Sequence, residues 1–323
     1  MDPVRRPGPL QLAGREAPAL YALGLLFTVV GVSALVVGFA GVGVGLALIG
    51  LTGVGIGGIC LSGASALQRR IDTSDEGWRG PGPLAIFWTT IPWALLAQLL
   101  IAGLLTAAGA ASVLSSPLGT LLLASASNLA SVGIIALVVV GSGAVRWRDL
   151  VLATPASSPP TLPSPDRRGG LAGDLLWGAA LALPILSAAG LFATLVMEGT
   201  GVRAPAVLPP TLNAAGIALN ALTAGVIAPI GEELLYRGVI TQAWGRQSSA
   251  RRAILFSAVV FAFAHTLTVS GSSVADAATS AAVAFLVRMP LGLALGWLYI
   301  RRRSLVATVA LHAIYNLAIV AIS

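Results

Sequence analysis

The chain has 323 residues, of which 56 % are hydrophobic and 10 % charged, and its mean hydropathy is +0.90. Soluble domains carry far more charge, so this composition excludes a soluble globular class and indicates a polytopic integral membrane protein. The net charge is +7, the positive charge comes entirely from arginine, and no aromatic and basic binding surface accompanies it. We therefore expect no nucleic-acid partner.

The apolar segments predict an all-α transmembrane helical bundle of about eight or nine spans, since a spanning helix needs about 20 apolar residues. The first two segments are joined by a glycine-rich turn at Gly38, Gly41 and Gly43, and one long tilted span with a re-entrant segment is an alternative there. The candidate spans are residues 17–38, 44–67, 83–108, 119–145, 174–197, 212–240, 253–270, 277–300 and 304–323.

A stretch rich in proline and serine, residues 153–170, interrupts the hydrophobic pattern and suits an extended, solvated cytoplasmic linker better than a helix. It divides the chain into an N-terminal transmembrane region of about four spans, residues 1–152, and a second region, residues 171–323. The single cysteine, Cys60, excludes an intrachain disulfide and a cysteine-based metal site. Every residue with an expected chemical role lies in the second region.

The arginines predict the orientation of the bundle, because cytoplasmic loops carry an excess of basic residues. With the N-terminus in the cytoplasm of a multi-pass cell-membrane protein, 16 of the 19 arginines lie inside and only Arg203 lies outside. The other two, Arg237 and Arg288, fall within predicted spans and need a partner or a water-filled cavity.

Two adjacent carboxylates lie in the sixth span, where Glu232 and Glu233 follow Pro229 and Gly231. On a helix, Glu233 and Arg237 are i and i+4 neighbours and can form an ion pair, which leaves Glu232 on a different face. An unpaired carboxylate in an apolar cavity is a more effective general base near neutral pH than a carboxylate exposed to water. The alternative is a solvated helix end at the cytoplasmic surface.

Both histidines of the chain also lie in apolar segments. His265 follows Phe261 at a spacing of four, and His312 and Asn316 have the i and i+4 spacing that places an imidazole and a carboxamide on one helical face. Both groups can donate hydrogen bonds to a developing oxyanion. A packing histidine and an interhelical hydrogen-bond pair are the structural alternatives.

These polar groups lie at similar depths in their spans. Measured along each helix from the nearest cytoplasmic arginine, Glu232, His265 and His312 lie about 21, 20 and 14 Å deep at 1.5 Å per residue. Three separate segments therefore place polar groups where they could share one cavity.

The ordered motifs Glu232-Glu233-xxx-Arg237, Phe261-xxx-His265 and His312-xxx-Asn316 resemble those of the CPBP family. That family comprises CAAX prenyl proteases of the Ras-converting type and the Abi proteins of bacteriocin processing and self-immunity. The resemblance covers roughly residues 171–323, with no departure at the motif positions, and the front half carries no motif of this kind.

The resemblance implies an intramembrane endopeptidase that acts on a membrane-associated peptide or protein. In it, Glu232 with His265 would activate a water molecule, His312 and Asn316 would stabilise the oxyanion, and the Glu233–Arg237 ion pair would orient the site. We expect no cofactor. Zinc held by Glu232, His265 and His312 is the alternative, although no His-Glu-x-x-His sequence is present.

Other functions and roles stay open at this point. A non-catalytic immunity or scaffold protein of the same fold would keep these residues for binding, and a proton-coupled transporter would use them as a relay. Arg288 could meet a substrate carboxylate in the same cavity, or it could form a structural pair with a backbone carbonyl or with a loop acid such as Glu198. Neither the prenylation of a substrate nor the oligomeric state is specified by the sequence.

Overall fold

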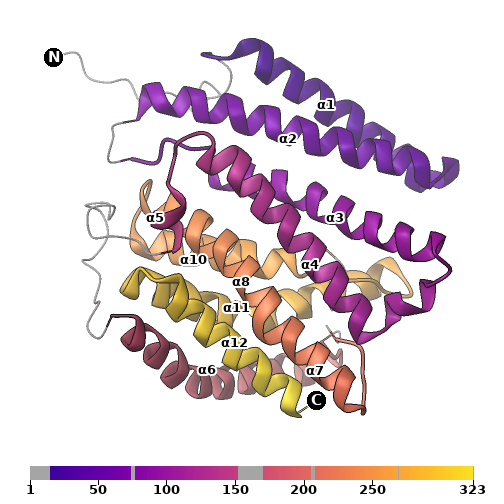
Figure 1. Cartoon of the computed structure of the whole chain (residues 1–323), viewed down its shortest axis with the longest axis vertical. Helices are drawn as coiled ribbons and strands as arrows, with labels where there is room; N and C mark the ends of the chain where they lie inside the picture. Colours follow the sequence, from indigo (N-terminus) through magenta and orange to yellow (C-terminus); the bar gives the residue numbers. More distant parts are fainter. Residues whose placement is uncertain (1–14, 74–76, 152–169, 205–207, 268, 323) are drawn as a thin grey trace. The chain divides into compact units, whose positions relative to one another are not determined.

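The computed structural model describes residues 15–73, 77–151, 170–204, 208–267 and 269–322, and the regular elements in these ranges are helices (Figure 1). The predicted all-α class is thus confirmed. The chain forms two compact units, one of Met1–Leu100 with Leu129–Trp147 and the other of Ile101–Asn128 with Arg148–Ser323. The predicted linker, residues 153–170, lies outside the described residues except for Gly170.

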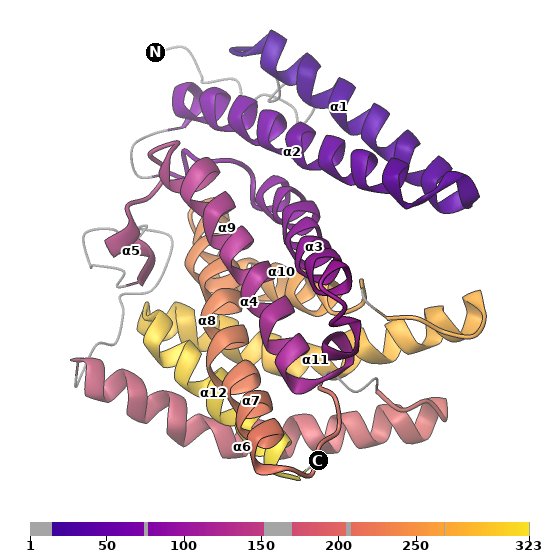
Figure 2. The same ribbon diagram turned by 45° about the vertical axis from the view of Figure 1, so that its right-hand side comes forward.

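The first unit is built on two antiparallel helices, α1 (Pro18–Val37) and α2 (Val44–Asp72), which lie side by side in Figures 1 and 2. The chain reverses at Gly43, whose φ of 133° favours glycine. The absence of a side chain on Gly31 lets the two helices approach closely. A Cβ at this position would lie 2.6 Å from the Val54 nitrogen. The segment therefore forms two helices, not one long tilted span. Its other elements are η1 (Gly38–Val42), α3 (Pro83–Ala107) up to Leu100, the last turns of α4 (Pro117–Ile134), and η3 (Ile135–Val140).

The second unit packs two long helices, α6 (Gly170–Thr200) and α11 (Val274–Arg302), together with the shorter α12 (Leu305–Ile322). α12 contacts both α6 and α11, and α10 (Ala250–Ala264) packs along α11. A buried ion pair joins α6 to the end of α11, with Arg302 Nη2 2.7 Å from Asp174 Oδ1. The segment from 214 to 245 is continuously helical but alternates between α- and π-helical winding. Its elements are α7 (Ala214–Leu222), η5 (Thr223–Ile227), α8 (Ala228–Glu233), η6 (Leu234–Thr241) and α9 (Gln242–Gly245). The unit also holds η2 (Ala111–Ser115) and, from Arg148 onward, α5 (Trp147–Val151).

Seven helical segments within the described ranges are long and apolar enough to cross a membrane, so the protein is a multi-pass membrane protein. Each corresponds to a predicted span, and the other two predicted spans coincide with shorter helices, α10 and α12. The seven segments are Pro18–Ala40, Val44–Asp72, Pro83–Ala107, Pro117–Val140, Gly170–Thr200, Ala214–Gly245 and Val274–Arg302.

Candidate active site

The two glutamates lie at the end of α8, between the π-helical segments η5 and η6. Pro229 cannot donate the hydrogen bond of a regular helix, and the wider winding of η5 immediately precedes its turn. Asn128 of α4 donates from Nδ2 to the Ile227 oxygen at 2.6 Å. A Cβ on Gly231 would overlap the Asn128 side chain, so a glycine is needed for this contact beside the glutamates.

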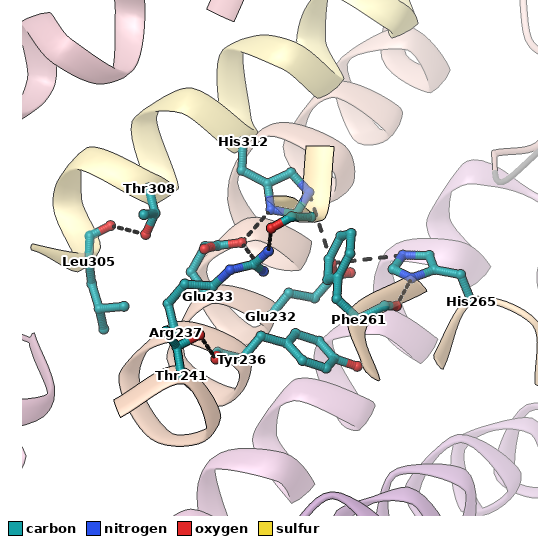
Figure 3. Close-up of polar contacts among 11 residues, drawn as sticks. Glu232, Glu233, Tyr236, Arg237, Thr241, Phe261, His265, Leu305, Thr308 and His312 are labelled. Atoms are coloured by element: carbon teal, nitrogen blue, oxygen red, sulfur yellow. Dashed lines mark hydrogen bonds and ion pairs between the residues drawn. The ribbon is translucent and has the colours of Figure 1, made fainter. Parts of the chain in front are cut away.

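Glu233 is the centre of a buried polar network (Figure 3). Its Oε1 accepts a hydrogen bond from Arg237 Nη1 at 3.0 Å and lies 2.8 Å from His312 Nδ1. Arg237 is fully buried and also donates from Nη2 to the Gly292 oxygen of α11 at 3.1 Å. The Glu233–Arg237 pair expected from the i, i+4 spacing is therefore present, and it ties η6 to α11 and α12.

Glu232 lies between the two histidines. Its Oε2 is 3.9 Å from Nε2 of His265 and 3.9 Å from Nε2 of His312. Its side chain keeps a quarter of its area exposed, although Oε2 itself is buried and has no hydrogen-bond partner among the described residues. Catalytic hydrogen bonds are often long before substrate binds, so these separations suit a site that closes around a water molecule and a substrate.

The hydrogen bonds of the two imidazoles indicate which ring nitrogen carries hydrogen. His265 Nδ1 lies 2.8 Å from the Phe261 oxygen, and a carbonyl oxygen can only accept, so this nitrogen carries hydrogen. The Glu233 carboxylate holds hydrogen on His312 Nδ1 in the same way. In both neutral rings the basic nitrogen is then Nε2, the atom that faces Glu232.

The aromatic ring of Phe261 contacts several of these groups. Its ring centroid lies 4.7 Å from that of His265, 5.8 Å from that of His312 and 5.3 Å from that of Tyr236. The Arg237 guanidinium carbon lies 4.7 Å from the same centroid, a cation–π distance. Phe261 thus packs against both histidines and the buried cation.

Asn316 lies one helical turn after His312 and binds a backbone oxygen of another helical segment. Its Nδ2 donates to the Ala224 oxygen of η5 at 3.0 Å, so the amide ties α12 to the π-helical segment before the glutamates. Five of the six residues predicted for the site, Glu232, Glu233, Arg237, His265 and His312, are connected by the contacts above. Sequence reasoning missed Asn128 and Tyr236, and of the two only Asn128, a polar residue in an apolar span, gave a signal. The spacing of Gly292 and Gly296 indicated close helix packing, but not the hydrogen bond from Arg237 to Gly292.

The donor arrangement does not fit a metal centre. Among the described residues, no group of three or more His, Cys, Asp or Glu side chains could hold a metal ion. Zinc needs nitrogen and oxygen ligands at about 2.0–2.2 Å in tetrahedral geometry. The Glu232, His265 and His312 side chains, as they lie, do not provide it.

An apolar hollow of about 350 Å³ lies between α6 and α11. It contains none of the residues predicted for the site. Its lining is formed by Leu181, Ile185, Pro290, Leu293, Ala294 and Trp297.

These features define a class: a multi-pass helical membrane protein with a carboxylate and two imidazoles gathered inside a bundle. Residues 214–318 match the family model Rce1-like, described as "Type II CAAX prenyl endopeptidase Rce1-like". The matched region runs from α7 into α12 and includes all six residues predicted for the site. The match is consistent with the CPBP family and confirms the resemblance found in the sequence.

The other comparisons found no relatives. No curated protein and no solved structure matches the chain.

Proposed function

We propose that the second unit is an intramembrane endopeptidase that hydrolyses a peptide bond of a membrane-associated peptide or protein. The observation that carries this proposal is the position of Glu232 Oε2, 3.9 Å from Nε2 of both histidines. A family of peptidases matches the same region. Two imidazoles around a carboxylate provide a base, a proton carrier and a hydrogen-bond donor.

In the proposed reaction, a water molecule held by Glu232 and His265 gives a proton to the Glu232 carboxylate as its oxygen attacks the peptide carbonyl. For its part, His312 must gain a second proton on Nε2, the nitrogen that is free in the neutral ring. It then donates from Nε2 to the oxyanion, while Glu233 accepts the hydrogen bond from Nδ1 and balances the charge. The amide hydrogen of Asn316 that is not bound to Ala224 is a second donor. The intermediate collapses as its C–N bond breaks, the carbonyl re-forms, and the proton on Glu232 passes to the nitrogen of the leaving amine.

The test is cleavage of a reporter peptide library, prenylated and unprenylated, by purified protein in lipid nanodiscs. We expect Glu232→Gln to lower kcat by about 10²–10⁴-fold, because an amide cannot accept the proton. Glu198→Gln is the matched control, since Glu198 is exposed near the end of α6 and contacts none of these groups. It should retain full activity.

A zinc chelator separates the two chemistries. The glutamate mechanism requires cleavage to continue in its presence, whereas loss of cleavage would favour a zinc site. Undiminished cleavage by Glu232→Gln would contradict the assignment of the base. Absence of cleavage by the wild type across the library would favour a non-catalytic immunity or scaffold function.

A further inference from the structure

Arg288 is the second arginine inside a membrane-spanning helix, and its environment differs from that of Arg237. It is half-buried in α11, and its Nη1 donates to the Ala284 oxygen of its own helix at 3.0 Å. It forms no ion pair within the described ranges. Each of its side-chain nitrogens nevertheless either forms a hydrogen bond or keeps some exposed surface. The remaining N–H groups are therefore accessible, which is typical of an intramembrane cation that lines a cavity.

The packing of α10 on α11 places Arg288 beside the site. A Cβ on Gly296 would lie 3.4 Å from the Ile254 Cα, and one on Gly292 would lie 3.2 Å from the Ala258 Cα. The two helices thus run antiparallel. Positions spaced four residues apart on α11 lie opposite positions spaced four residues apart on α10. The next step of this register brings Arg288 to the end of α10, where His265 lies.

Electrostatics agrees with this register. Arg288 and Glu232 both lie close enough to His265 for a coulombic interaction. Glu232 and Tyr315 are likewise within coulombic range of Arg288. Gly292, one turn after Arg288, accepts the hydrogen bond from Arg237. Arg288 therefore lies about 6 Å along α11 from the contact that anchors the buried ion pair.

We propose that Arg288 binds a carboxylate of the substrate and so sets which peptide bond reaches Glu232. A guanidinium matches a carboxylate through paired hydrogen bonds, and the partly desolvated setting strengthens them. An extended peptide advances about 3.3–3.6 Å per residue. A carboxylate held at Arg288 then lies only a few residues from the bond that is cut, which suits the free end of a peptide chain.

This inference rests on the proposed function, and its test separates the two. Three matched peptide pools are used: free C-terminal acids, the same peptides as C-terminal amides, and amides with one added glutamate. Binding is measured on the Glu232→Gln protein and cleavage on the wild type. We expect the acid pool to be preferred about 10- to 100-fold over the amide pool, and Arg288→Gln to abolish the preference.

Two further variants support the interpretation. Arg288→Lys keeps a charge without the planar fork and should retain part of the preference. Arg203→Gln, which removes an exposed arginine outside the site, should retain all of it. Recovery of binding by the glutamate-containing amides would identify an acidic side chain as the source of the carboxylate and still support the role of Arg288.

Equal treatment of acid and amide pools by protein with Arg288 intact would overturn the inference. The same holds if Arg288→Gln lowers acid and amide cleavage equally, because that result would make Arg288 a positioning residue for Glu232 and His265. Arg288-dependent binding of acids without any cleavage would instead support the binding role while the endopeptidase proposal fails.

Discussion

Glu233, Arg237 and His312 are buried together, and Glu233 Oε1 contacts both basic side chains. Removal of one member of a buried charge pair leaves the other uncompensated and costs about 3–5 kcal/mol. We expect Arg237→Met to lower the free energy of unfolding by this amount. The double variant Glu233→Gln with Arg237→Met should be more stable than the sum of the single effects predicts, because it removes both charges.

The measurement is the free energy of unfolding in detergent micelles for the wild type, both single variants and the double variant. Arg203→Met is the control, because Arg203 is exposed and lies outside the site. Additive effects of the two substitutions would show that the ion pair contributes no coupling energy.

Contacts at this scale were predictable only where sequence spacing fixes them. The Glu233–Arg237 pair follows from one helical turn. The contact between Glu233 and His312 joins residues 79 positions apart and depends on the packing of α12. The spacing of His312 and Asn316 predicts a shared face, but the bond of Asn316 to Ala224 depends on where η5 lies.

At the scale of elements, the position of α12 depends on a close approach of α6. A Cβ on Gly178 would lie 2.6 Å from the Ala307 oxygen and 2.8 Å from the Leu311 nitrogen, both in the α12 backbone. A larger side chain must push away the helix that carries His312. We expect Gly178→Leu to lower the free energy of unfolding by about 1–3 kcal/mol and to reduce cleavage.

The matched control is Gly190→Leu on the same helix, where an added Cβ meets nothing within 4 Å. Thermal unfolding and peptide cleavage are compared for the two variants. A Gly178→Leu protein as stable and active as Gly190→Leu would contradict the role of this contact in placing α12.

Hydropathy predicted the helices well but not their winding or their ends. The predicted span 253–270 is displaced from α10, which begins at Ala250 and ends at Ala264, because hydropathy does not register that the chain turns at His265. The π-helical segments on both sides of α8 have the same apolar composition as an α-helix. Their wider hydrogen bonding depends on tertiary packing, and such segments are frequent at functional sites.

At the scale of the whole molecule, the orientation in the membrane is still a prediction from the arginines. It places the loop that contains Gln247 in the cytoplasm and the loop that contains Arg203 outside. Cys60 is the only cysteine, so Cys60→Ser provides a background without thiols for labelling. We expect a membrane-impermeant maleimide to label Arg203→Cys in intact cells, and Gln247→Cys only after permeabilisation.

Both positions are exposed in the structure, so each thiol should react wherever the reagent reaches it. The Cys60→Ser protein without a new cysteine shows the background labelling. The result also decides on which side of the membrane the loop between the segment that carries Glu232 and α10 lies. Labelling of Gln247→Cys in intact cells would reverse the predicted topology and place this loop outside the cell.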